Sequence, residues 1–326
     1  MSFYWSALDP ELRVWIDETA SAPAGSSIPV LREVSRRNNK VAFSRMPSSL
    51  ITHAVVDEQF DGPAGPITVR ILSPEVGSDV VKGTPLIVFF HGGGWTLCDL
   101  DTHLAATHRL CREVGAVVIA VDYRRSPEHR FPAAFDDCVA AAEWAFSNCR
   151  KLGADPRRFV LAGDSSGAQL AASVAIARRD AGNPLAAQLL LYPVTSAVGG
   201  YADPDVNASF PSRAEFATGP VVTLASMAYF VGSYADLADT ADWRISPICA
   251  DLKGVAPAVV HLAGIDVLRD EGNRYAEALD STGVQVVRRE FPSLNHGYFG
   301  LGGVSKAADK AARMAALDLR QMLNLS

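Results

Sequence analysis

The chain has 326 residues and a formal net charge of -6, and it shows no basic stripe, which argues against a general nucleic-acid-binding protein. Hydrophobic residues make up 48% of the sequence and charged residues 20%, as in ordinary globular proteins, and a chain of this length forms a core without disulfide or metal support. Its longest apolar runs fall far short of the roughly 20 residues that a helix needs to cross a bilayer, so we expect no stable membrane insertion.

The first part of the sequence, residues 1–45, is expected to form two short helices. Residues 9–20 place Asp9 as an N-cap before Pro10, and helical spacing resumes at 29–42. No basic region followed by an apolar core stands at the N-terminus, so we expect no signal peptide. The cysteines, five in number, include no C-x-x-C pair, which predicts reduced thiols in a cytoplasmic protein rather than a disulfide framework or a zinc site.

Strand patterns begin at residue 52 and then alternate with helical patterns. Two strands around a Gly/Pro turn, at 52–60 and 67–72, are expected to be antiparallel. Continuous apolar runs predict buried strands at 85–91, 115–123, 158–164, 186–194, 257–264 and 284–291. Helical patterns lie between or after them, at about 102–114, 132–153, from 166 onward and at 304–323. About eight strands in this rhythm indicate an α/β fold with a mostly parallel sheet flanked by helices.

One segment interrupts this alternation. Residues 197–245 contain no strand pattern, only a polar loop with prolines and an apolar helical stretch at 221–234. Because an insertion of this length in an α/β fold usually serves function, we expect it to contribute to the site.

The most informative motif is GDSSG at residues 163–167, between a strand and a helix. It matches the G-x-S-x-G pattern of a nucleophile elbow, a sharp turn that holds its serine in a strained backbone conformation. Such a turn requires very small neighbours, which Gly163 and Gly167 supply. Ser165 is then the candidate nucleophile, and the backbone N–H of Ser166 points from a helix N-terminus to where an oxyanion would form. The alternative interpretation is a flexible serine-rich loop.

A second motif, HGGGW at residues 91–95, follows another strand. It matches the glycine loop that accompanies a nucleophile elbow and completes its oxyanion hole. We expect Gly93 and Gly94 to donate N–H groups together with Ser166, and Gly92 to permit the bend. The alternative, a phosphate-binding loop, needs a following Lys-Ser/Thr or a G-x-G-x-x-G pattern, and this segment has neither.

A nucleophilic serine needs a base, and the base needs an orienting carboxylate. Asp266 lies just beyond the strand at 257–264, and His296 follows the strand at 284–291. The resulting chain order of serine, acid and histidine is the one expected for this elbow, and both residues fall at the carboxyl edge of the sheet. We therefore predict Ser165, Asp266 and His296 as the catalytic residues.

Other candidates fit the position less well. His261 lies inside a strand pattern and is expected to be a packed core residue. Asp270 and Glu271 begin the next helix, where acids are favoured by the helix dipole. His103 and His108 are five residues apart, a poor spacing for a shared metal ion, so we predict no metal site.

With these residues in place, the chain from about residue 50 resembles the bacterial hormone-sensitive-lipase family of α/β-hydrolase esterases. The shared segments are HGGGW, GDSSG, DYRRSPEHRFPAAFDD at 122–137, GIDVLRDEG at 264–272 and NHGYF. The resemblance implies an α/β-hydrolase catalytic domain over 46–326, with helical cap elements at 1–45 and 197–245. It also implies a homodimer.

Three positions depart from the commonest family pattern. Ala168 stands where a further glycine is frequent, Ser126 replaces an alanine, and Cys98 replaces a glycine after the oxyanion loop. Cys98 is expected to narrow the mouth of the pocket and so to affect substrate size rather than activity.

Four residues beside the motifs have expected roles. Glu128 and His129 are interpreted as structural support beneath the site. Asp164, which precedes the nucleophile, is expected to anchor the elbow through hydrogen bonds. Trp95 is assigned to substrate binding, with packing behind the pocket as the alternative.

The predicted reaction is the hydrolysis of short- to medium-chain acyl esters by a carboxylesterase through an acyl-enzyme, without metal or organic cofactor. The partner is a small-molecule ester. Candidates to cover an apolar acyl pocket are Phe3, Tyr4, Trp5, Phe216, Met227, Tyr229 and Phe230. At least half of them are expected to pack only within the cap.

Two alternative functions are compatible with these motifs. The same residues could hydrolyse an amide or remove an acetyl group from a small molecule. A catalytically silent small-molecule receptor, like the plant gibberellin receptors that resemble this family, is the other alternative. Those receptors lack the catalytic histidine, whereas His296 is present here.

Overall fold

The computed structural model describes residues 3–19, 25–74, 83–183 and 185–325. Its strands are β1 Val55–Gly62, β2 Gly65–Leu72, β3 Leu86–Phe90, β4 Val117–Val121, β5 Phe159–Asp164, β6 Ala187–Leu191, β7 Ala258–Ile265 and β8 Val286–Asn295. Its α-helices are α1 Phe3–Ala7, α2 Pro10–Glu18, α3 Ile28–Ser44, α4 Leu104–Arg109, α5 Ala133–Asn148, α6 Ser166–Asp180, α7 Pro204–Ala208, α8 Pro211–Glu215, α9 Leu224–Tyr234, α10 Arg269–Ser281 and α11 Lys306–Met322. Short helical segments are η1 Ser48–Leu50, η2 Leu110–Gly115, η3 Pro156–Arg158, η4 Val198–Tyr201, η5 Leu237–Asp239, η6 Pro247–Cys249 and η7 Tyr298–Leu301.

All eight strands form one sheet in the order β1-β2-β4-β3-β5-β6-β7-β8. The pairs β1–β2 and β2–β4 are antiparallel, and the remaining pairs are parallel. The prediction of a mostly parallel sheet with an antiparallel first pair is confirmed. The carboxyl ends of the parallel strands meet at one edge, where loops after different strands can combine into one site.

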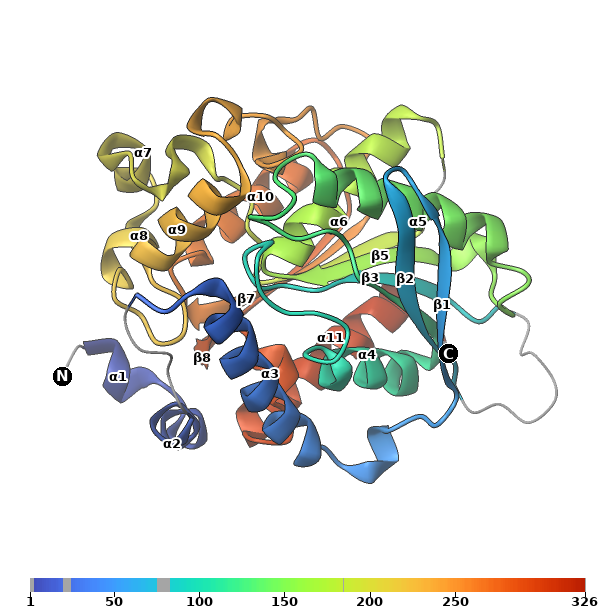
Figure 1. Ribbon diagram of the computed structural model, residues 1–326, viewed down its shortest axis with the longest axis horizontal. Coiled ribbons are helices and arrows are strands. Elements are labelled where there is room, and N and C mark those ends of the chain that lie inside the picture. Colours follow the sequence, from blue (N-terminus) through green and yellow to red (C-terminus); the bar gives the residue numbers. More distant parts are fainter. Residues whose placement is uncertain (1–2, 20–24, 75–82, 184, 326) are drawn as a thin grey trace.

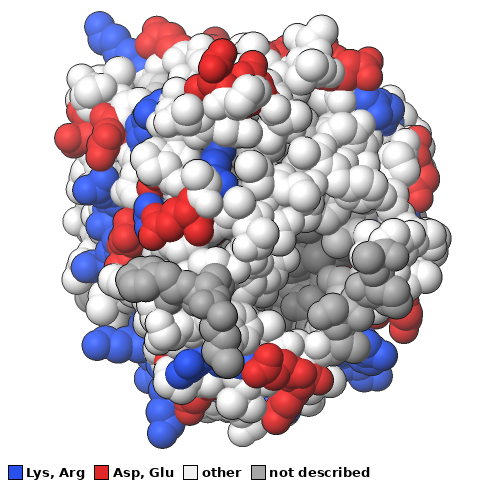
Figure 2. All heavy atoms as spheres, turned by 90° about the vertical axis from the view of Figure 1, so that its left-hand side faces the viewer, with Lys and Arg blue, Asp and Glu red and all other residues white. Residues whose placement is uncertain are grey.

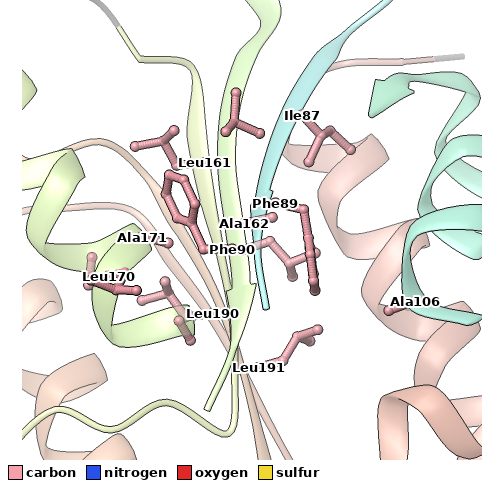
Figure 3. Close-up of a cluster of buried hydrophobic side chains, with 14 of the residues drawn as sticks. Ile87, Phe89, Phe90, Ala106, Leu161, Ala162, Leu170, Ala171, Leu190 and Leu191 are labelled. Atoms are coloured by element: carbon pink, nitrogen blue, oxygen red, sulfur yellow. The ribbon is translucent and has the colours of Figure 1, made fainter. Parts of the chain in front are cut away.

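Helices cover both faces of this sheet (Figure 1). The helices α5, α6 and α10 lie on one face, and α4 and α11 lie on the other. Strands β3 to β7 are buried along their whole length because both of their faces are covered, which explains their continuous apolar sequences. Figure 3 shows Phe89 on the side of Ala106 from α4, whereas Leu170 and Ala171 of α6 lie on the opposite side.

The sequence predicted two of the N-terminal helices and missed the first. Within the described part of residues 1–45, α2 and α3 lie close to the helices expected at 9–20 and 29–42, and α1 is an additional short helix. The helix expected at about 102–114 is the α-helix α4 followed by a π-helical turn, η2. Within the part of the chain that the structure describes, no helix is long and apolar enough to cross a membrane.

The insertion at 197–245 contains only helical segments and loops, as expected. It lies at the same end of the molecule as the N-terminal helices (Figure 1). The hydroxyl of Tyr4 donates a hydrogen bond to the Thr218 carbonyl oxygen, and the Tyr4 and Phe216 rings pack edge to face with centroids 5.9 Å apart. Two segments that are about 200 residues apart therefore contact each other beyond the carboxyl edge of the sheet.

Candidate active site

The turn between β5 and α6 has the geometry of a nucleophile elbow. Ser165 has a φ of 56°, a left-handed conformation that is uncommon for a residue with a side chain. A Cβ on Gly163 would lie 2.3 Å from the Gly167 carbonyl oxygen, and a Cβ on Gly167 would lie 2.0 Å from that of Phe90. Only glycine fits at both positions, so this turn depends on the two glycines of the motif.

Three predicted residues, far apart in the sequence, form one chain of hydrogen bonds. His296 Nε2 lies 2.8 Å from Ser165 Oγ, and His296 Nδ1 lies 2.7 Å from Asp266 Oδ2. These residues follow β8, β5 and β7, whose carboxyl ends share one edge of the sheet. The other oxygen of Asp266 accepts the N–H of Leu268 at 3.0 Å, which fixes the carboxylate. The arrangement links a hydroxyl, an imidazole and a carboxylate in the order required for serine activation.

The imidazole of His296 is buried, and its environment favours the protonated form. Burial alone would lower its pKa, but the charge of the Asp266 carboxylate and the hydrogen bond to it act in the opposite direction and outweigh burial. The pKa of His296 is therefore raised above its ordinary value of 6.5. An imidazole that gains a proton readily is suited to accept one from a serine hydroxyl.

The glycine loop after β3 adopts a left-handed backbone through three consecutive residues. Gly93, Gly94 and Trp95 have φ values of 107°, 60° and 55°. The carbonyl oxygen of Gly93 accepts the N–H groups of Thr96 and Leu97 at 3.1 and 2.8 Å, which closes the loop. Gly93 and Gly94 line the same cavity as Ser165 and His296, as expected for oxyanion donors.

Gly92 does not serve as an oxyanion donor, although the sequence motif placed it in the oxyanion hole. Its N–H donates to Asp164 Oδ1 at 2.8 Å, so it is not available to a substrate oxygen. The left-handed bend begins one residue later, at Gly93. Gly92 is nevertheless required to be small, because an added Cβ would lie 2.6 Å from Asp164 Oδ2. The structure thus corrects Gly92 from an oxyanion-hole residue to a close-packing residue.

Hydrogen bonds from Trp95 to Ser166 and Gln169 connect the glycine loop to α6, the helix that follows the elbow. The Ser166 hydroxyl oxygen accepts the Trp95 N–H at 3.2 Å. The Trp95 side chain is fully buried, stacks on Tyr234 with centroids 4.6 Å apart, and donates its indole N–H to Gln169 at 2.8 Å. Trp95 does not line the cavity, so its assignment to substrate binding is wrong. Its large aromatic surface is used for packing instead.

Asp164 connects the elbow to His103, a residue that no sequence motif marks as part of the site. His103 Nε2 lies 3.0 Å from Asp164 Oδ1, and both residues line the cavity. Burial acts to raise the pKa of the Asp164 carboxyl, but the His103 imidazole and the Gly92 N–H outweigh it and hold that pKa below its usual value. Asp164 is therefore a hydrogen-bonded anchor, as predicted, with His103 as an additional partner.

The cavity above Ser165 has a volume of about 470 Å³. Of the residues expected to cover it, Met227 and Phe230 line it, whereas Phe216 is buried against Tyr4 and Tyr229 is 47% exposed. The Phe3 side chain lies outside the described residues, and Trp5 packs against the core. Figure 2 shows a hollow on this face of the molecule, with mainly uncharged residues on its described surface.

Glu128 and His129 lie at the surface rather than beneath the site. The Glu128 carboxylate accepts two hydrogen bonds from the Arg32 guanidinium, at 2.7 and 2.8 Å, and its side chain is 53% exposed. His129 is exposed. Arg32 also donates to the Thr96 carbonyl oxygen at 2.8 Å, so Glu128 supports the site indirectly, by orienting the arginine that links α3 to the glycine loop.

Two rejected candidates have structural partners of their own. His261 is buried within β7, and its Nε2 lies 2.8 Å from Asp318 Oδ2. Glu271 is fully buried and accepts hydrogen bonds from the Thr195 N–H at 2.9 Å and from Arg213 at 2.7 Å. The interpretation of Glu271 as an acid placed for the helix dipole is therefore incomplete, because it links α10 to the insertion. Among the described residues, no three His, Cys, Asp or Glu side chains gather to bind a metal ion.

Comparison with known proteins agrees with the fold. Residues 87–300 match a family described as the alpha/beta hydrolase fold. Esterase LipI of Mycobacterium tuberculosis is 39% identical over 83% of this chain and 82% of its own length, and Carboxylesterase NlhH of the same organism is 35% identical over 97% of both chains. The solved esterase of Pyrobaculum calidifontis has a TM-score of 0.85 and 34% identity, covering 97% of this chain and 99% of its own.

The fold and the similar proteins define a class, the α/β hydrolases. Within that class, the chain belongs to the hormone-sensitive-lipase-like family of bacterial esterases. The family expected from the sequence motifs is confirmed, and with it the enzyme class, a carboxylic ester hydrolase.

Proposed function

We propose that this protein is a carboxylesterase that hydrolyses short- to medium-chain acyl esters of small molecules through an acyl-enzyme. The observation that carries this proposal is the pair of hydrogen bonds that connect Ser165 to His296 and His296 to Asp266, at 2.8 and 2.7 Å. No metal or organic cofactor takes part in the proposed reaction.

The first half of the reaction forms the acyl-enzyme. His296 Nε2 accepts the hydroxyl proton as Ser165 Oγ attacks the ester carbonyl carbon, and Asp266 stabilises the resulting imidazolium. The tetrahedral intermediate then collapses, the bond to the alcohol oxygen breaks, and His296 donates the proton to the leaving alcohol. Water repeats this sequence on the acyl-enzyme, which releases the carboxylic acid and restores the serine hydroxyl.

Developing negative charge on the carbonyl oxygen is stabilised by backbone N–H groups. We assign Gly93, Gly94 and Ser166 as these donors, since two of them line the cavity and the third begins α6 directly after the nucleophile. Removal of one such donor typically lowers the rate by about 10²–10³.

The helical segments at 1–45 and 197–245 are proposed to form the cap, with 46–326 as the catalytic domain that the insertion interrupts. Contacts between Tyr4 and the 216–218 segment support this division, as does the cavity lining that both parts share. A cavity of about 470 Å³ with Met227 and Phe230 in its wall supports short to medium acyl chains.

Two finer points belong to the same proposal. Cys98, Cys138, Cys149 and Cys249 form no disulfide bond, which supports a cytoplasmic protein. The family resemblance supports a homodimer.

A panel of p-nitrophenyl esters from acetate to palmitate tests the proposal, with the wild type and Ser165→Ala. The wild type should be most active on the shorter members, and Ser165→Ala should be slower by about 10⁴–10⁶. Equal rates in the two proteins would show that Ser165 is not the nucleophile. A wild type that releases acid from amides or acetylated small molecules but not from these esters would favour the alternative function.

A further inference from the structure

The cavity has two walls of unlike chemistry, one on each side of the glycine loop. A Cβ on Gly94 would lie 2.5 Å from Phe230 Cγ, whereas a Cβ on Gly93 would lie 2.8 Å from Cys98 Sγ. The two glycines therefore face different walls. The wall beside Gly94 comes from the insertion and is apolar, formed by Val221, Val222, Met227 and Phe230.

The other wall continues from Cys98 along α3 and carries polar groups. Cys98 Sγ lies 3.4 Å from Ser35 Oγ, and Ser35, Asn38 and Asn39 line the cavity together with Val34. Residues three and four positions apart share one side of a helix, so the serine and the two asparagines form a single stripe. A helix stripe that only packs against a protein interior is normally apolar. The residues of this stripe instead line an open cavity.

The polar stripe is held in a fixed position relative to the glycine loop. Arg32 Nε donates to the Thr96 carbonyl oxygen at 2.8 Å, and Arg36 pairs with Asp99 at 2.7 Å. These contacts lie on either side of Ser35 in α3 and reach the segment that directly follows the glycine loop. A rigidly held hydrogen-bonding group can select a ligand at little entropic cost.

Asn39 lines the cavity and carries an amide group whose nitrogen is already engaged. Its Nδ2 donates to the Ser35 carbonyl oxygen at 2.9 Å and lies 3.4 Å from Ser35 Oγ. Because the amide nitrogen is directed to the helix backbone, the Oδ1 atom is directed away from it. Over the described ranges of the chain, this oxygen accepts no hydrogen bond. An amide oxygen of this kind, in a half-buried residue of the cavity wall, is suited to a ligand hydroxyl or N–H group.

We infer that the preferred substrates are esters with two unlike arms, an inference that rests on the proposed esterase function. The apolar arm packs against Met227 and Phe230. The other arm carries a hydroxyl or amide N–H that donates to Asn39 Oδ1. A purely alkyl ester displaces water from Asn39 Oδ1 but donates no hydrogen bond to it in exchange. A site with such an unsatisfied acceptor therefore discriminates against alkyl esters.

Two pairs of esters with matched length test this inference. The first pair, pentyl butanoate and ω-hydroxybutyl butanoate, differs on the alcohol arm. The second pair, methyl heptanoate and methyl ω-hydroxyhexanoate, differs on the acyl arm. Hydrolysis is followed by titration of the released acid, and the readout is the kcat/KM of the hydroxyl ester divided by that of its alkyl partner. The ratio is informative because both esters of a pair meet the same catalytic residues.

The variants are Asn39→Leu, which removes the acceptor, and Asn148→Leu as a matched control. Asn148 Nδ2 makes the same bond to a carbonyl oxygen four residues earlier, Trp144 at 2.9 Å, but it lies on α5 and does not line the cavity. For at least one pair, the ratio should fall about five- to tenfold in Asn39→Leu, the loss of one hydrogen bond, and should be unchanged in Asn148→Leu.

The possible results separate the inference from the function on which it rests. Equal ratios in the wild type and Asn39→Leu for both pairs, with all esters hydrolysed, would overturn the inference and leave the esterase function intact. A similar fall in Asn148→Leu would also overturn it. A wild type that hydrolyses no ester would overturn both.

Discussion

Asp164 Oδ1 accepts the backbone N–H of Gly92 at a distance of 2.8 Å. This hydrogen bond links the residue before the proposed nucleophile to the start of the glycine loop. A Cβ on Gly92 would lie 2.6 Å from the other oxygen of the same carboxylate. The position of the proposed oxyanion donors relative to Ser165 therefore depends on a glycine that donates to none of the reacting atoms.

Gly92→Ala should lower kcat through displacement of this loop. The added methyl group has to move either the loop or Asp164, and misplacement of an oxyanion donor costs about 10²–10³ in rate. Steady-state kinetics on p-nitrophenyl butyrate measure the effect. Gly232→Ala is the matched control, because its Cβ would meet nothing within 4 Å in α9 and alanine is favoured in helices. An equal loss of kcat in the two variants would contradict this interpretation.

The pH dependence of kcat/KM should report the raised pKa of His296. The base must be neutral to accept the serine proton, so activity should rise with pH and reach half of its plateau above pH 6.5, the ordinary value for histidine. Asp266→Asn removes the main contribution that raises this pKa. The midpoint should then move to lower pH, and kcat should fall by about 10⁴. A midpoint that stays in place without the Asp266 carboxylate would show that another group controls the profile.

The buried ion pair between Arg213 and Glu271 should matter for stability. The two groups are 2.7 Å apart, and both side chains are 0% exposed. Glu271→Ala leaves the guanidinium buried without its charged partner, which typically costs about 3–5 kcal/mol in the free energy of unfolding. Urea denaturation measures this free energy.

A surface ion pair provides the comparison. Glu277 and Arg288 are 2.9 Å apart, but their side chains are 69% and 44% exposed. Glu277→Ala should therefore change the free energy of unfolding by only about 0–1 kcal/mol. If the Glu271 and Glu277 variants were destabilised equally, the buried network around Glu271 would not be what holds the insertion in place.

Phe230→Ala should shift the acyl-chain preference. The ring lies in the apolar wall of the cavity, against Gly94, and its removal lengthens the space available to a substrate. The ester with the highest kcat/KM should therefore be longer than for the wild type. Tyr229 is its neighbour on α9 but is 47% exposed, so Tyr229→Ala should keep the wild-type preference. An unchanged optimum in Phe230→Ala would place the acyl chain elsewhere.

Much of the fold could be predicted because strands that are buried on both faces of the sheet have continuous apolar sequences. Strands β3 to β7 are continuous apolar runs, and each was expected within a few residues of its bounds. Among the N-terminal helices, α2 and α3 were expected close to their bounds, but α1 was not expected. The helix α1 has only 5 residues, too few for apolar periodicity to identify it.

The roles of single residues depend on contacts that the sequence does not encode locally. Gly92 and Asp164 are 72 positions apart, and Glu271 and Arg213 are 58 apart. The sequence motifs named the residues at the centre of the site, but the partners that hold them are determined by tertiary packing. Trp95 illustrates the difference, because its position beside the glycines suggested substrate contact while the fold turns its side chain into the core.

Covalent labelling of the nucleophile tests the central claim most directly. Diethyl p-nitrophenyl phosphate reacts with an activated serine, whose oxygen bonds to phosphorus as p-nitrophenolate leaves. Mass spectrometry of the intact chain and of its peptides should find a single diethylphosphoryl group, on Ser165, and none in Ser165→Ala or His296→Ala. A label on another residue, or equal labelling of Ser165→Ala, would contradict the assignment of Ser165, His296 and Asp266 as the reacting group.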